Sequence, residues 1–252
     1  MRLKNSVLDW GARACVLPLL AAPVSNPDLY WHLNAAGRML AEGRLPRDDA
    51  FSFTRLGDRW VDFEWLFQLT ALGAEAAAGA WGLWALKAAL WSLAAALVEG
   101  AGRLSGGAPR GRLLLALWCA ASLGRAELKP ELFSLAFFLA LFLLLDSADR
   151  GLLPEASPVS AAAGAALIFA CWANLHAGWP VGLGLIAAFL VFGAERARPA
   201  CAAALAAGAA ATLLNPYGCE VWTVLAEHLR FTPLLTEKIL EWGPLTPRNP
   251  YH

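Results

Sequence analysis

The sequence has few charged residues. Only 16% of its 252 residues are Asp, Glu, Lys or Arg, whereas a soluble globular domain carries about a quarter. Basic and acidic residues number 20 each, so the formal net charge is zero and nucleic acid is not an expected partner. The chain also lacks the GxSxG, HExxH, Walker A and glycine-rich nucleotide-binding patterns. These absences argue against ATP-driven chemistry and against the common soluble hydrolase mechanisms.

Cysteine is sparse and scattered. No CxxC pair occurs, so the sequence implies neither a disulfide framework nor a zinc site. Four of the five cysteines fall in hydrophobic segments, where buried packing is the default interpretation. The five are Cys15, Cys119, Cys171, Cys201 and Cys219.

Hydrophobic residues make up 58% of the chain and come in blocks of Ala and Leu. The blocks have roughly the length that a helix needs to cross a bilayer core of about 30 Å. We therefore predict an all-α polytopic membrane protein, a single transmembrane domain over residues 1–252 with about seven transmembrane helices. The predicted spans are residues 10–24, 81–99, 111–124, 130–146, 159–175, 179–194 and 199–214.

The first apolar segment has two interpretations. A basic start and a short apolar run are also typical of a cleaved signal peptide. Asp9 and Arg13 lie within that segment and fit a signal peptide poorly. We therefore interpret residues 10–24 as a short first membrane helix, and the signal peptide remains the alternative.

Residues 62–79 are ambiguous, because they are apolar but carry four polar side chains: Asp62, Glu64, Gln68 and Glu75. If this segment does not cross the membrane and the N-terminus is cytoplasmic, the arginine-rich loops all lie in the cytoplasm, as the positive-inside rule requires. If it does cross, the rule fails repeatedly. We favour the non-crossing model, which makes residues 25–80 a large first external loop with amphipathic juxtamembrane helices and 215–252 an external C-terminal segment.

This topology gathers the polar loops on one side of the membrane. Four of them lie on the external face: the stretch through Glu64 and the loops at 124–131, 172–179 and 215–220. Because ionisable groups at membrane depth are expensive and usually functional, we predict a site at that face.

Asp28 and His32 are four residues apart, so they share one face if their segment is helical. Asn26 and Pro27 before them are typical of a helix start. An acid in the first turn and an interfacial histidine would explain the pair without any function. Glu64 stands between two aromatic residues where the chain re-enters apolar sequence, and an acid at such a boundary is usually paired or functional.

Further candidates lie in the other external loops. Arg125 and Lys129 are one turn apart at the end of a predicted span; they either extend toward the interface or clamp phosphate oxygens. Asn174 and His176 follow a long apolar helix, where a lone histidine is more often structural. Glu241 lies beside a tryptophan near the C-terminus.

The order of these motifs resembles a known superfamily. The stretch PDLYWHLNAAGRMLAEGRLPRDDAFSFTRLGDRWVDFEWLFQ is followed by RAELKPELFS, WANLHAGWPVG, NPYG and ILEWGP. Together they resemble the bacterial GT-C membrane glycosyltransferases, relatives of the polyprenyl-phosphate-sugar transferases and protein mannosyltransferases. The resemblance runs from about residue 26 to the end and is most specific in the first block. Such proteins are generally longer, so the resemblance leaves two interpretations of the chain, an N-terminal fragment or a truncated member.

The resemblance implies a multi-pass protein of the bacterial inner membrane with its active site on the external, periplasmic face. It implies a polyprenyl-phosphate sugar as donor and an acidic residue in the first loop, best matched by Asp28, that acts as base or contacts substrate or metal. Many members carry a second acid nearby, but Asn26 stands two residues before Asp28. A divalent metal ion is therefore in doubt, and the acceptor is unknown.

The predicted reaction transfers a sugar from the lipid phosphate to an acceptor hydroxyl. Asp28 is the candidate base, with His32 or Glu64 assisting. Arg125 and Lys129 would stabilise the leaving phosphate, and the list of predicted substrate-binding residues is completed by Asn174, His176 and Glu241. Two other classes remain open: a transporter or flippase of lipid-linked intermediates, and a non-catalytic membrane scaffold.

Overall fold

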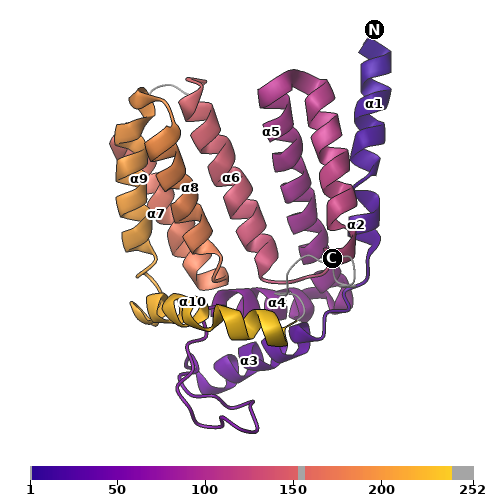
Figure 1. The fold of residues 1–252 in the computed structure, drawn as a ribbon. Coiled ribbons are helices and arrows are strands. Elements are labelled where there is room, and N and C mark those ends of the chain that lie inside the picture. The colour runs from indigo at the N-terminus through magenta and orange to yellow at the C-terminus, as the bar shows by residue number, and fades with distance from the viewer. Residues whose placement is uncertain (1, 153–156, 240–252) are drawn as a thin grey trace.

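The computed structural model describes residues 2–152 and 157–239, with side chains described from residue 7 onward. Within those ranges the regular structure is helical, apart from one isolated bridge between Asp48 and Arg59. Helices α5 to α9 stand side by side as a bundle, while α3, α4 and α10 lie across one end of it (Figure 1). The helices are α1 (Arg2–Ala14), α2 (Leu17–Ala21), α3 (Asp28–Glu42), α4 (Trp65–Ala78), α5 (Ala80–Ser122), η1 (Leu123–Arg125), α6 (Glu131–Asp149), α7 (Pro158–Leu175), α8 (Trp179–Phe192), η2 (Glu195–Ala197), α9 (Arg198–Ala211) and α10 (Glu220–Lys238).

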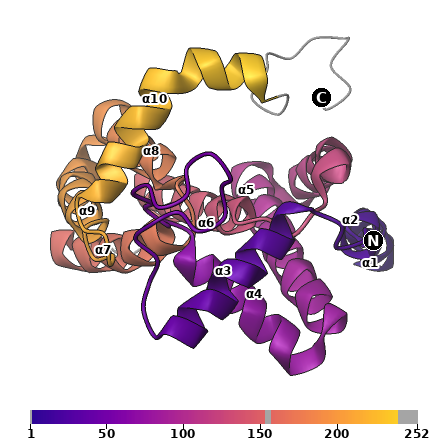
Figure 2. The same ribbon diagram turned by 90° about the horizontal axis from the view of Figure 1, so that it is seen from below.

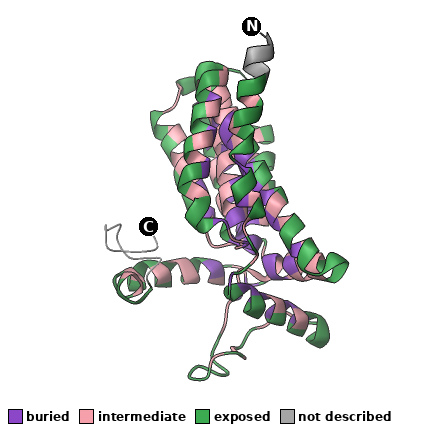
Figure 3. Ribbon diagram, turned by 90° about the vertical axis from the view of Figure 1, so that its right-hand side faces the viewer, coloured by how far each residue is buried: buried purple, intermediate pink, exposed green. Residues whose placement is uncertain are grey.

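Three helical stretches are long and apolar enough to cross a membrane: Ala80–Arg125, Glu131–Asp149 and Pro158–Leu175. Their outer faces carry large exposed apolar side chains, such as Leu117 and Leu167, as expected of surfaces that contact lipid. In Figure 3 exposed residues cover the outer faces of the bundle, and buried residues gather where the bundle meets the end helices. The protein is thus all-helical in its described part, with three candidate spans; the number of seven stays a prediction.

Helix α5 is a hairpin of two antiparallel legs (Figure 1). Its backbone leaves helical geometry at Gly106 and Gly107, where Gly107 has a φ of +71°, a conformation that only glycine adopts without strain. Beside this turn the legs approach closely, because a Cβ on Gly102 would lie 2.7 Å from the Cα of Gly111. The two legs coincide with the separate spans predicted at 81–99 and 111–124.

The first predicted span, residues 10–24, is not one continuous helix. Helix α1 ends at Ala14 and α2 begins at Leu17. Pro18 lies in the first turn of α2, and proline lacks the N–H that a continuous helix would use and clashes with the carbonyl four residues before it. The break between α1 and α2 therefore follows from the proline.

The end helices are amphipathic rather than uniformly apolar. In α3 the buried side chains Leu29, His32 and Ala36 recur at helical spacing, whereas Tyr30 and Leu40 are exposed. Seen from below, α3 and α4 lie against one another and α10 curves along the far edge (Figure 2). Helix α4 occupies most of the ambiguous segment 62–79, and it lies across the bundle end rather than along the bundle.

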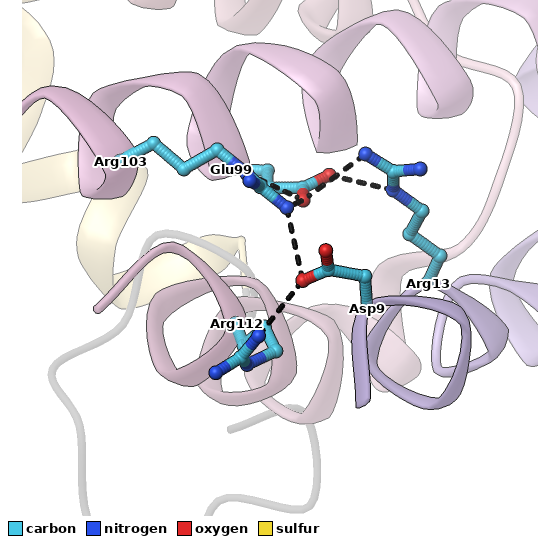
Figure 4. Close-up of polar contacts among 5 residues, drawn as sticks. All are labelled: Asp9, Arg13, Glu99, Arg103 and Arg112. Carbon is cyan, nitrogen blue, oxygen red and sulfur yellow. Dashed lines mark hydrogen bonds and ion pairs between the residues drawn. The ribbon is translucent and has the colours of Figure 1, made fainter. Parts of the chain in front are cut away.

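At the opposite end of the bundle, five charged residues tie α1 to both legs of α5 (Figure 4). Glu99 accepts hydrogen bonds from Arg13 Nε at 3.0 Å and from Arg103 Nε at 2.8 Å. Asp9 accepts from Arg103 at 3.1 Å and from Arg112 at 2.9 Å. We call these five residues the arginine cluster. Its two acids therefore each contact two guanidinium groups.

All five cysteines are free thiols. Cys119 and Cys201 are buried in apolar packing and Cys171 is partly buried, whereas Cys15 and Cys219 are exposed.

Candidate functional site

The candidate site centres on Glu64, the residue that immediately precedes α4. Its carboxylate lies between two imidazole rings: His32 Nε2 is 3.9 Å from Oε2, and His176 Nε2 is 3.8 Å from Oε1. Both distances are too long for a direct hydrogen bond, but each ring nitrogen faces a different carboxylate oxygen. Three of the residues that the sequence singled out, from three distant segments, thus lie together at the end of the bundle.

The two histidines are held in different ways. His32 is 3% exposed on the buried face of α3, with its ring against the edge of Phe67 at a centroid distance of 5.0 Å. His176 caps the C-terminus of α7, where its backbone is extended. Its Nδ1 lies 2.7 Å from Ser134 Oγ on α6 and accepts the N–H of Gly178 at 3.1 Å.

Asn174 anchors the residue next to Glu64. Its Oδ1 accepts the indole N–H of Trp65 at 2.7 Å, and its Nδ2 donates to the carbonyls of Ala170 and Leu214 at 2.6 and 3.0 Å. The sequence predicted a substrate contact for Asn174, whereas in the structure its amide bonds to protein atoms. It therefore fixes Trp65, and with it the start of α4.

Burial dominates the electrostatics of the site. It raises the pKa of Glu64 to about 8, aided by the negative charges of Asp62, Glu131 and Asp28. Burial also lowers the pKa of His176 to about 4 and, with repulsion from His176, that of His32 to about 4. At pH 7 the site thus holds a protonated carboxyl group between two neutral rings, since desolvation disfavours every charged form.

A second buried acid, Asp62, lies two residues before Glu64 and is 2% exposed. Its Oδ1 accepts a hydrogen bond from Gln68 Nε2 at 2.8 Å, while Asp62 Oδ2 and Gln68 Oε1 have no hydrogen-bond partner among the described side chains and backbone. Burial raises the pKa of Asp62 to about 7. Two buried acceptor oxygens without donors are costly, and a proton on the Asp62 carboxyl is a donor that would relieve that cost.

Asp28, the predicted catalytic base, is exposed at the first residue of α3. Its backbone N–H donates to Asn26 Oδ1 at 3.0 Å, so Asn26 supports the helix start as predicted, although the helix begins one residue later. The structure gives Asp28 an electrostatic effect on Glu64 but places Glu64, not Asp28, between the histidines.

The predicted phosphate clamp lies in the loop before α6. Arg125 ends η1 and is exposed, and Lys129 is partly buried with its Nζ 3.6 Å from Glu127. This loop leads into the first turns of α6, which carry Glu131 and Ser134. Glu241, also predicted to bind substrate, lies outside the described residues.

Sequence reasoning missed three residues of this site: Asp62, Ser134 and Trp172. Asp62 was noted only for making its segment polar. Ser134 ends the motif RAELKPELFS and Trp172 begins WANLHAGWPVG, but a single serine or tryptophan in an apolar helix is usually a packing residue, so neither side chain stands out by itself.

The resemblance leaves a divalent metal ion as an open question. Among residues 7–152 and 157–239, no group of three or more His, Cys, Asp or Glu side chains is arranged to hold one. The two imidazole nitrogens of the site face the same carboxylate and not a common point.

A cleft of about 270 Å³ separates the C-terminal half of α3 from the loop at residues 44–60. It does not include Glu64. Its charged walls are engaged within the protein: Glu42 pairs with Arg38 and with Arg44, and the Asp49 carboxylate accepts the Phe51 N–H at 2.8 Å. The cleft thus offers few uncommitted polar groups.

Comparison with known proteins finds no matching family model, no similar curated protein and no similar solved structure.

Proposed function

We propose that this protein is a membrane glycosyltransferase that transfers a sugar from a polyprenyl-phosphate donor to an acceptor hydroxyl at the external face of a bacterial inner membrane. The observation that carries the proposal is the Glu64 carboxyl group, which lies largely shielded from water between His32 and His176 at one end of an apolar helical bundle. A buried, perturbed acid with two imidazoles in contact is an arrangement typical of acid–base chemistry. The GT-C-like order of motifs supplies the class of reaction.

In this proposal Glu64 takes the role that the sequence gave to Asp28. A general base works best when its pKa lies near the operating pH, and burial raises the pKa of Glu64 to about 8. The exposed Asp28 acts on the base through its charge, which disfavours the ionised form of Glu64. His32 and His176 hold the carboxyl group between them.

At the anomeric carbon, one bond forms and one bond breaks. The acceptor oxygen bonds to the anomeric carbon and its proton passes to Glu64, while the bond from the anomeric carbon to the phosphate oxygen breaks and its electron pair leaves with the phosphate. Because phosphate is already a good leaving group, it needs cationic stabilisation rather than a strong acid. Arg125 and Lys129 are the candidates for this role.

The transporter alternative gains no support from Lys87, the charged residue in the middle of the predicted span 81–99. Lys87 on α5 is fully buried, and its ammonium group donates to the carbonyl of Ala22 at the end of α2. That contact ties α5 to the chain leaving α2, which explains the lysine structurally.

The test is donor turnover by the purified protein in liposomes. Polyprenyl-phosphate hexoses with a radiolabelled sugar are supplied with candidate acceptors, and release of free polyprenyl phosphate is measured. We expect turnover by the native protein to rise with pH up to about 8, as Glu64 loses its proton. We expect Glu64→Gln to lower it at least ~100-fold, with Asp28→Asn much less affected.

Turnover by Glu64→Gln equal to that of the native protein would remove Glu64 from the mechanism. No turnover of any donor by a folded native protein would contradict the proposed function itself.

A further inference from the structure

The two nitrogens of the His176 ring face different partners. Nδ1 lies 3.1 Å from the backbone N–H of Gly178 and 2.7 Å from the hydroxyl of Ser134, whereas Nε2 faces Glu64 Oε1 at 3.8 Å. A neutral imidazole carries one proton, and the partners of one nitrogen decide where it resides.

The Gly178 N–H can only donate, so Nδ1 must offer it a lone pair. The contact is close and specific, because any side chain at position 178 would place its Cβ 2.4 Å from Ser134 Oγ. Glycine is thus the residue that lets this backbone N–H and the serine share one ring nitrogen.

The direction of the Ser134 hydrogen bond is set from its other side. Trp172 Nε1 lies 2.6 Å from Ser134 Oγ, and an indole N–H is a donor only. Ser134 therefore accepts from Trp172, which leaves its own proton for His176 Nδ1. Donor and acceptor roles run in one direction, from Trp172 through Ser134 to His176.

We propose that Ser134 is a positioning residue that, with Trp172 and Gly178, holds His176 in the tautomer protonated on Nε2. The ring then presents an N–H, rather than a lone pair, to Glu64. A donor facing a carboxylate favours the ionised form, whereas a lone pair would favour the protonated acid. In the proposed glycosyltransferase, on which this role rests, the tautomer keeps Glu64 able to lose its proton near neutral pH.

The tautomer itself can be measured without any substrate. The chain has four histidines, so ¹⁵N-histidine labelling gives few ring signals, and His176→Gln identifies those of His176. We expect the native protein at pH 7 to show a protonated Nε2 and an unprotonated Nδ1 for His176. We expect Ser134→Ala to add a population protonated on Nδ1, and Ser134→Thr, which keeps the hydroxyl, to restore the native pattern.

A protonated Nδ1 in the native protein, or unchanged ring signals in folded Ser134→Ala, would overturn the assignment. Trp172→Phe serves as a second variant: it keeps an aromatic ring in the packing but removes the indole donor, and we expect a smaller shift in the same direction.

The effect on the reaction is a separate readout. We expect Ser134→Ala to move the pH–rate midpoint of donor turnover up by about one unit, and hence to lower turnover at pH 7 about tenfold, while Ser134→Thr returns the native profile. A purely packing role would lower turnover equally at every pH. If the native tautomer is as assigned but no donor turns over, the glycosyltransferase proposal fails and the ring assignment stands.

Discussion

The two ends of the bundle treat a buried glutamate in opposite ways. The side chain of Glu99 in the arginine cluster is 9% exposed and bonds to two guanidinium groups (Figure 4). The side chain of Glu64, at the other end, is 15% exposed and has two imidazoles at 3.8 and 3.9 Å instead. Both are acids removed from most water, so the difference lies in their partners.

A guanidinium stays charged at every pH that a protein meets, so Glu99 can balance its charge without a proton. The imidazoles of the buried His32 and the partly buried His176 are neutral at pH 7, because removal from water lowers the pKa of each to about 4. Among the residues that the structure describes, the ion pairs of Glu64 are with these two imidazoles and not with a permanent cation. The comparison teaches that the arginine cluster is suited to fasten helices and the Glu64 site to exchange protons.

The largest loss of turnover among these tests is expected when Glu64 is given a permanent cation as its partner. His32→Lys places an ammonium group next to Glu64, which should ionise the carboxyl group and return its pKa to that of an ordinary paired acid. A base weakened by several pKa units should work roughly 100-fold more slowly. Turnover measured from pH 5 to 9 should lose the rise toward pH 8 that we expect of the native protein.

His32→Gln is the matched control, because it is polar and neutral. It should keep most of the rise with pH even if its maximal turnover falls. A His32→Lys protein that keeps the native pH profile would show that the absence of a cation beside Glu64 is not what matters.

The second test removes the charge of the glutamate in the arginine cluster. Glu99→Gln leaves Arg13 and Arg103 without their carboxylate, and loss of one partner of such a buried, charge-assisted pair costs about 2 kcal/mol of unfolding free energy. Unfolding in detergent, followed by circular dichroism, measures the loss. Donor turnover per folded molecule should be unchanged, since this cluster lies at the far end of the bundle.

Glu195→Gln provides the control for that measurement. Glu195 also pairs with an arginine, Arg198, at 3.3 Å, but its side chain is 88% exposed. Because exposed pairs are screened by water and salt, this variant should unfold like the native protein. Equal destabilisation by the two variants would mean that burial does not set the strength of the arginine cluster.

The sequence predicts the helices of the bundle better than it predicts the arrangement of the site. Helices α7 and α8, at Pro158–Leu175 and Trp179–Phe192, lie within two residues of the predicted 159–175 and 179–194, because long apolar runs with Pro and Gly at their ends define a helix locally. Helix α10 was missed within the segment 215–252. It contains Pro233 and mixes charged with apolar residues, so it has no long apolar run from which a helix would be predicted.

For the site, the sequence named His32, Glu64 and His176 as candidates, and the structure places their side chains together. It could not rank Glu64 above Asp28, since burial decides between them and burial is a tertiary property. The same limit hid Ser134, whose importance comes from a contact 42 positions along the chain. The partners of the arginine cluster are also up to 103 residues apart, and no local pattern pairs them.

Asp62 sharpens the comparison, because it is buried with an amide partner and without a cation. Burial raises its pKa to about 7, so the folded state binds the proton more tightly than the unfolded state. The stability that this proton contributes is complete below about pH 4 and is lost as pH rises through 7. Asp62→Asn mimics the protonated acid and should escape that loss.

We therefore expect Asp62→Asn to unfold like the native protein at pH 4 and to be more stable by on the order of 1–2 kcal/mol at pH 9. Unfolding midpoints across that range measure the difference. A variant less stable than the native protein at pH 9 would show that Asp62 is held as a carboxylate. Gln68→Leu, which removes the amide, should lower stability at both pH values.

The smallest effect is expected where an ion pair lies near the Glu64 end but in water. Arg59 donates to Glu220 at 2.6 and 2.7 Å and so links the first loop to the start of α10, yet both side chains are more than a third exposed. Solvent screening makes such pairs weak. Glu220→Gln should shift the unfolding midpoint less than Glu99→Gln does, and added salt should remove the shift. A loss of stability as large as that of Glu99→Gln would mean that position in the fold, rather than burial, decides how much a paired glutamate contributes to stability.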